Sequence, residues 1–178
     1  MGEAGSQLAL IGFMGTGKTT VGRLLAAELG SEFVDLDALI AERSGLSIPA
    51  IFAREGEEGF RRREKELLRA VAGRPRQVLA TGGGIVLDPA NVETLRATGL
   101  VVWLHASLSA IVARVGRGEG RPLLKGGDLE TTAAALLAAR EEIYRRAADF
   151  AVDTTDLPPA EVARRVAAWF RRRIREEG

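Results

Sequence analysis

A glycine-rich segment near the start of the chain has the residue types and the spacing of a phosphate-binding loop. It runs from Gly12 to Thr19 and reads G-F-M-G-T-G-K-T, which fits the pattern G-x-x-x-x-G-K-[ST]. Glycines at this spacing let backbone N–H groups wrap around phosphate oxygens, the lysine adds a mobile positive charge, and the threonine hydroxyl can reach a bound Mg²⁺. The pattern predicts a nucleoside triphosphate site whose contacts come from Gly15, Thr16, Gly17, Lys18, Thr19 and Thr20.

Two carboxylates follow the next short apolar run of the chain. Asp35 and Asp37 stand on either side of a leucine, directly after Phe33 and Val34. Open α/β sheets bind ligands at the carboxyl ends of their strands, so we expect both side chains to lie near the phosphate loop. Asp37 can accept the proton of a substrate hydroxyl, and Asp35 can hold a water bound to Mg²⁺. The alternative is that Asp37 only caps the helix that follows.

Arginines at three separate places are further candidates for ligand contacts. Arg61 lies in a charged stretch where glutamates three or four residues away offer ordinary helix-surface ion pairs, so both interpretations stay open. Arg140 has a leucine four residues before it and a tyrosine four residues after it, which leaves it without a local acidic partner. Arg121 follows several glycines, and we expect it to reach the phosphates when its loop closes.

A run of three glycines, Gly82 to Gly84, follows another apolar stretch. Three glycines can form a simple turn, but at the carboxyl end of a strand they also permit backbone contact with a polar ligand. Both possibilities remain open on the sequence alone.

The pattern of apolar residues predicts the elements that must position these side chains. Short apolar runs predict strands near residues 8–11, 32–35, 77–80, 100–104 and 150–152. Helices are expected between them, including one that opens at Ser47, a separate charged helix over 57–72, and one that begins at Asp88. This alternation indicates one α/β domain over residues 1–178 with a mainly parallel sheet, and the glycine-dense residues 115–127 are interpreted as a mobile lid.

Composition excludes several classes of protein. The chain has no cysteine, so disulfides, zinc–thiolate sites and thiol nucleophiles are excluded. Its net charge is +1 with 5% aromatic residues, which argues against a nucleic-acid partner. No leader pattern and no apolar run of membrane-spanning length is present, so we expect a cytoplasmic protein without a membrane partner.

Taken in order, these motifs resemble the shikimate kinase family over nearly the whole chain. The segments that carry the resemblance are the phosphate loop continued to Arg23, Phe33-x-Asp35-x-Asp37, Phe60-Arg61-x-x-Glu64, Gly82-Gly83-Gly84 and Arg121-Pro122-Leu123-Leu124. Ile85 departs slightly from the family, which often has alanine at that position.

The resemblance implies a fold, a reaction and a role for each candidate residue. The fold is the three-layer one of nucleoside-monophosphate kinases, with a five-stranded parallel sheet and a lid. The reaction is transfer of the γ-phosphate of ATP to the 3-hydroxyl of shikimate, within aromatic amino-acid biosynthesis, with Mg²⁺ as cofactor. Asp37 binds the substrate hydroxyls and is the base, Arg61 and Arg140 bind the carboxylate, and Gly83 contributes backbone. Arg121 and Arg114 contact the nucleotide, the catalytic set is Lys18, Asp37 and Arg121, and a monomer is expected.

Two other functions remain as alternatives. Another small-acceptor kinase of the same architecture, such as a gluconate kinase, would also need a pocket for a carboxylate and hydroxyls. A regulatory P-loop module that does not transfer phosphate is a second possibility, although it would have no use for an acceptor pocket. A guanine-nucleotide switch is disfavoured because the chain lacks an Asn-Lys-x-Asp motif and an Asp-x-x-Gly motif.

Overall fold

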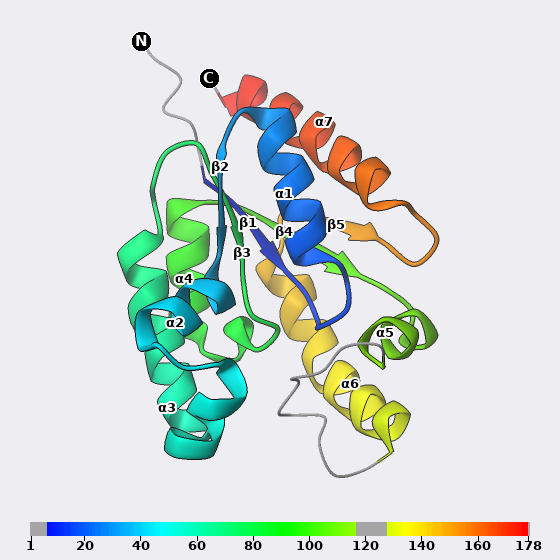
Figure 1. Ribbon diagram of the computed structural model, residues 1–178. Helices are drawn as coiled ribbons and strands as arrows, with labels where there is room; N and C mark the ends of the chain where they lie inside the picture. Colours follow the sequence, from blue (N-terminus) through cyan, green and yellow to red (C-terminus); the bar gives the residue numbers. More distant parts are fainter. Residues whose placement is uncertain (1–6, 117–127, 178) are drawn as a thin grey trace.

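Five parallel strands form a single sheet in the order β2-β3-β1-β4-β5 (Figure 1). The structure is a computed structural model that describes residues 7–116 and 128–177. Most of the expected lid, with Arg121, lies outside the described residues. The strands are β1 (Gln7–Ile11), β2 (Glu32–Asp35), β3 (Gln77–Ala80), β4 (Gly99–His105) and β5 (Phe150–Asp153). The strand order is typical of an α/β fold in which the first strand lies at the centre of the sheet.

Helices cover both faces of this sheet. The described helices are α1 (Lys18–Leu29), α2 (Leu36–Ser44), α3 (Ile48–Val71), α4 (Pro89–Thr98), α5 (Leu108–Val115), α6 (Leu129–Ala147), α7 (Pro159–Glu177) and a short 3₁₀ helix, η1 (Ile85–Leu87). Helices α1 and α7 lie side by side on one face, while α2 to α6 cover the other (Figure 1). The three layers confirm the predicted fold class.

Alternation along the central strand explains the two cores. Leu8 and Leu10 point into the core beneath α1 and α7, whereas Ala9 and Ile11 point into the core beneath α2 to α6. All four side chains are fully buried. Residues 8–11 form a continuous apolar run because helices cover both faces of this strand. This central position puts the loop after β1 in the middle of the carboxyl edge of the sheet.

The helices agree with the expectations from the sequence, with two exceptions. Ser47 and Asp88 cap α3 and α4 as expected. The two helices expected after Ser47 are confirmed: α3 is interrupted at Gly56, whose φ of 70° and ψ of −176° are not helical, and the charged helix continues from the next residue. The cap of α2 is Asp35, whose Oδ1 accepts a hydrogen bond from the Ala38 N–H at 3.1 Å. The capping alternative for Asp37 is therefore wrong, and η1 after the glycine run was not predicted.

Within the described ranges, no helix combines the length and the apolar character needed to cross a membrane.

Candidate active site

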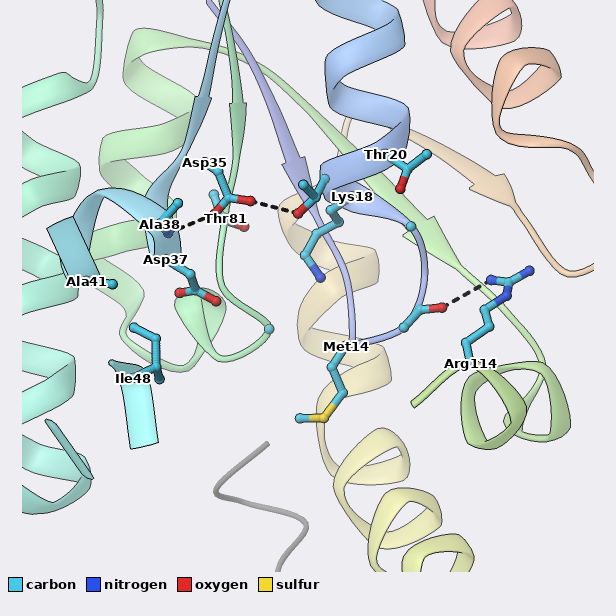
Figure 2. Close-up of a pocket in the computed structure, with 14 residues that line it drawn as sticks. Met14, Lys18, Thr20, Asp35, Asp37, Ala38, Ala41, Ile48, Thr81 and Arg114 are labelled. Carbon is cyan, nitrogen blue, oxygen red and sulfur yellow. Dashed lines mark hydrogen bonds between the residues drawn. The ribbon is translucent and has the colours of Figure 1, made fainter. Parts of the chain in front are cut away.

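The glycine loop after β1 forms the floor of a cavity of about 540 Å³ at the carboxyl edge of the sheet (Figure 2). Gly17 ends the loop in the left-handed region, with φ 96°, and α1 begins at the next residue. The first turn of α1 therefore presents its backbone N–H groups to the cavity, where a helix N-terminus favours an anion. The Lys18 ammonium folds back over the loop and donates to the Gly12 and Phe13 carbonyls at 2.6 and 3.0 Å.

The other predicted loop residues divide between the cavity and the interior. Gly15, Gly17, Lys18, Thr19 and Thr20 line the cavity. Thr16 is buried, and its hydroxyl donates to the Phe13 carbonyl at 2.8 Å, so this side chain holds the loop rather than facing the cavity.

Thr19 and Asp35 meet on the β2 side of the loop. The Thr19 hydroxyl donates to Asp35 Oδ2 at 2.7 Å, while the other Asp35 oxygen caps α2. A hydroxyl and a carboxylate next to a phosphate site are oxygen ligands of the kind that Mg²⁺ uses, with phosphates and waters filling the remaining positions. A dedicated cage of three or more acidic or histidine side chains is not found in the part of the chain that the structure describes. The pair therefore offers oxygen ligands that suit a Mg²⁺ ion bound to phosphates.

Asp37 lies one residue into α2 and lines the same cavity as the glycine loop. Figure 2 shows Asp35 and Asp37 on one side of the loop and Arg114 on the other. The sequence expectation that both carboxylates lie near the phosphate loop is confirmed.

Charged side chains from α2, α3 and α6 converge on the three glycines after β3. A methyl group at Gly82 would lie 2.7 Å from Glu64 Oε1 and 2.9 Å from Asp37 Oδ1. At Gly84 it would lie 2.1 Å from Arg61 Nη2, and at Gly83 it would lie 3.9 Å from Arg140 Nη1. A methyl group at Gly82 or Gly84 would therefore displace these charged groups, whereas Gly83 has ordinary room for one, and the run is more than a simple turn.

Arg61 and Arg140 thus lie against adjacent glycines although 79 positions separate them in the sequence. Arg61 also forms ion pairs with Glu64 at 2.9 Å and with Glu57 at 3.4 Å. The helix-surface contacts that the sequence suggested are therefore real, and yet the guanidinium also covers Gly84.

Arg140 is 4% exposed, unusually buried for an arginine, and lies on the inner face of α6. Its guanidinium carbon is 5.8 Å from the centre of the Phe13 ring, and its Nη1 has no hydrogen-bond partner among the described residues. A buried donor without a partner costs free energy, which points to a ligand acceptor at this place.

Glu64 is a buried carboxylate that sequence reasoning did not assign to the site. Its side chain is fully buried, one Oε2 contact goes to Arg61, and Oε1 has no hydrogen-bond partner in the described ranges. Burial raises the pKa of Glu64 to about 7, and the positive charge of Arg61 acts in the opposite direction. The available signal was its position one turn after Arg61, on the buried face of α3.

A second cavity of about 240 Å³ lies on the far side of the loop, toward β5 and α7. Arg114 lies between the two cavities and donates to the Gly15 carbonyl at 3.1 Å and to the Thr154 carbonyl at 2.8 Å. Thr16 and Thr20 also line this cavity, with Thr154, Leu157 and Pro159 closing it. The last three residues were missed, although the rule that ligands bind at the carboxyl ends of strands applies to β5 as well.

The fold and the site define the class of this protein before any comparison. A phosphate-binding loop at the centre of a parallel sheet, with carboxylates and arginines gathered around a neighbouring glycine turn, is typical of a P-loop kinase for a small molecule.

Comparison with known proteins identifies the family. The family model of shikimate kinase matches residues 14–171. The shikimate kinase of Geobacter sulfurreducens is 48% identical over 167 residues, covering 94% of this chain and 92% of that protein. The shikimate kinase of Moorella thermoacetica is also 48% identical, with 92% and 95% covered. This chain belongs to the shikimate kinase family.

Solved structures agree with this assignment. Shikimate kinase from Acinetobacter baumannii, in complex with shikimate, superposes with a TM-score of 0.91 and 39% identity over 94% of this chain and 93% of that one. A gluconokinase from Sinorhizobium meliloti has a TM-score of 0.60 at 18% identity, covering 97% and 95%, which shows a shared fold alone.

Proposed function

We propose that this protein transfers the γ-phosphate of ATP to the 3-hydroxyl of shikimate, giving shikimate 3-phosphate and ADP in aromatic amino-acid biosynthesis. Its membership of the shikimate kinase family supports the reaction. The observation that carries the proposal is that Asp37, Arg61 and Arg140 meet at one glycine turn beside the phosphate loop.

The nucleotide is proposed to occupy the loop and the second cavity. Its phosphates accept hydrogen bonds from the N–H groups at the start of α1, and Lys18 moves from the loop carbonyls to the β- and γ-phosphates. The base is proposed to lie between Arg114 and Pro159, where a guanidinium and a flat apolar ring line the cavity. Thr19, and Asp35 through water, hold Mg²⁺, which when bound neutralises charge on the phosphate oxygens.

The acceptor is proposed to lie across the glycine turn. Its carboxylate fits between Arg61 and Arg140, because two planar guanidinium groups offer paired N–H donors to two oxygens. Its hydroxyls then face Asp37, which orients the 3-hydroxyl toward the γ-phosphate and takes its proton as the bond to phosphorus forms.

Backbone donors at the glycine turn support the same placement. The carbonyls of Gly82 and Gly84 accept hydrogen bonds from Ile85 and Leu87 at 3.2 and 3.1 Å. None of the N–H groups of Gly82, Gly83 and Gly84 donates to an acceptor in residues 7–116 or 128–177. These N–H groups are suited to an oxygen of the acceptor.

Arg121 of the expected lid is also part of the proposal. It is expected to contact the transferring phosphate when the lid closes, as an arginine supplied by the same chain.

The protein is further proposed to be a monomer in the cytoplasm, with neither nucleic acid nor a membrane as partner. The net charge of +1 and the composition agree with this.

A coupled assay of ADP release tests the proposed function. Shikimate, quinate and gluconate are supplied at equal concentration with ATP and Mg²⁺. We expect turnover with shikimate to exceed turnover with either of the others by at least about tenfold, because the spacing of carboxylate and hydroxyls must fit both ends of the pocket. Faster turnover with gluconate would favour the other small-acceptor kinase, and no acceptor-dependent ADP release would favour a regulatory nucleotide-binding module.

A further inference from the structure

The carbonyl of Gly83 is held differently from its two neighbours. The carbonyls of Gly82 and Gly84 accept from N–H groups three residues further on, within the turn itself. The Gly83 carbonyl accepts from the hydroxyl of Tyr144, which lies 61 positions away on α6. This hydrogen bond connects the glycine turn to the helix that carries Arg140.

The surroundings of Tyr144 hold its hydroxyl in place. The side chain is fully buried, and its ring stacks on Trp103 of β4, with ring centres 6.0 Å apart and planes 19° apart. Tyr144 and Arg140 are one helical turn apart on the buried face of α6. A ring fixed by packing on one side therefore directs a single polar atom toward Gly83.

Acid–base chemistry is not available to this tyrosine. Burial raises the pKa of Tyr144 to about 12, although the charge of Arg140 acts in the opposite direction. The phenol therefore stays protonated at neutral pH and continues to donate. Its function must come from the hydrogen bond that it donates.

A tether on the Gly83 carbonyl determines where the next N–H group points. In a trans peptide the carbonyl of one residue and the N–H of the next point in opposite directions within one plane. With the Gly83 carbonyl directed at α6, the Gly84 N–H points away from α6. Consecutive glycines restrain the backbone less than any other residues, so without the tether this plane is free to rotate.

We propose that Tyr144 is a positioning residue for the acceptor, which fixes the peptide plane between Gly83 and Gly84 and holds Arg140 against the same turn. This inference rests on the proposed function, because it concerns binding of the same acidic acceptor. It assigns Tyr144 no contact with the reacting atoms. Its effect is therefore expected in acceptor binding and not in the phosphoryl-transfer step.

Tyr144→Phe tests the inference, because it removes the hydroxyl and keeps the ring that stacks on Trp103. We expect the KM for shikimate to rise by about fivefold to thirtyfold, as for a buried acceptor left without its donor, with kcat and the KM for ATP within about threefold of wild type. Thr98→Val is the matched control. It removes another part-buried hydroxyl, at the amino edge of the sheet beside Gln7, and should leave both KM values unchanged.

The outcomes separate this inference from the proposed function. No turnover of shikimate by wild type overturns both. Normal wild-type turnover with an unchanged shikimate KM in Tyr144→Phe overturns the inference alone, as does an equal change in both KM values, which marks a purely structural role.

A second measurement applies if Tyr144→Phe does not fold. The chain contains one tyrosine, so growth on 3-fluorotyrosine labels this position alone. We expect saturating shikimate to shift the single fluorine resonance and ADP alone to leave it in place. A resonance that does not respond to shikimate would overturn the inference.

Discussion

Two glycine-rich turns follow adjacent strands of the sheet, and only the first needs glycine for its backbone conformation. In the loop after β1, Gly12, Gly15 and Gly17 have φ values of 145°, 78° and 96°, which other residues rarely adopt. In the turn after β3 none of the glycines has a positive φ, and Gly84 has φ −99°. There the space of the missing side chains is filled by charged groups from α2, α3 and α6.

This difference separates the two halves of the site. The backbone of the first turn forms the phosphate site by itself, so this site depends on local conformation. The second turn brings together side chains from distant parts of the chain, so the proposed acceptor site depends on tertiary packing. Mutations in the first half should therefore affect nucleotide chemistry, and mutations in the second should affect acceptor binding.

The largest effect is expected for Lys18→Ala. Loss of the ammonium that neutralises the transferring phosphate should lower turnover by roughly 10³-fold or more, with the fold intact by circular dichroism. Lys65→Ala is the matched control. Lys65 forms an ion pair with Asp88 at 2.7 Å and does not line the cavity. Unchanged turnover in a folded Lys18→Ala variant would remove the nucleotide half of the account.

Asp37→Asn is expected to lower kcat by roughly 10²–10⁴-fold, the usual span for a positioned general base. The substitution keeps the shape of the side chain and removes its ability to take a proton. Steady-state kinetics with shikimate measures the effect. If kcat and the acceptor KM both stayed within about threefold of wild type, Asp37 would have a structural role.

Alanine at one glycine of each turn tests the comparison itself. Gly84→Ala places a methyl group on the tip of Arg61, a flexible side chain, so we expect about a tenfold rise in acceptor KM with little loss of stability. Gly17→Ala meets no close neighbour but is strained by its φ of 96°, so we expect weaker ATP binding and a loss of about 1–2 kcal/mol of stability. Titrations of each substrate against each variant measure this, and the same pattern in both variants would contradict the distinction.

A further effect, on stability and not on activity, is the dependence of the free energy of unfolding on pH. The pKa of Glu64 is raised from 4.5 to about 7 in the folded chain, so between these values the folded state keeps a proton that the unfolded state has lost. Stability should therefore fall as pH rises through this window, by about 2–4 kcal/mol from this group.

Glu64→Gln should remove that contribution. Urea unfolding at pH 4, 5, 6, 7 and 8 gives the free energy of unfolding of both proteins, and wild type minus variant should decrease toward high pH. A difference that is constant or that increases with pH would show that the buried carboxylate is ionised throughout.

Much of the fold could be predicted from the sequence, because its signals are local. Apolar runs gave all five strands, and Ser47 and Asp88 marked helix starts correctly. The break at Gly56 agrees with the sequence, which predicted separate helices on either side of it. Capping of α2 by Asp37 was only an alternative on the sequence, and the cap is Asp35, two positions earlier.

The site was predictable where a motif is local and less so where it depends on packing. The phosphate loop follows from its spacing, whereas the spacing of Arg61 and Glu64 does not tell a buried pair from a surface pair, and no pattern in the sequence reveals that Tyr144 reaches Gly83. Both contacts depend on how α3 and α6 pack around the glycine turn. Thr154 and Pro159 were missed because they contact the second cavity through the ends of β5 and α7.

The acceptor clamp of Arg61 and Arg140 is the central claim, and shikimate with its methyl ester tests it most directly. The ester keeps the hydroxyls and removes the negative charge. On the acid, Arg61→Ala and Arg140→Ala should each raise KM by about tenfold to a hundredfold, whereas Arg62→Ala, an exposed neighbour of Arg61, should not. On the ester, the kcat/KM of wild type should fall toward that of the single variants. The kcat/KM of the single variants should fall little further when the acid is replaced by the ester. Equal losses on acid and ester for both variants would contradict the clamp.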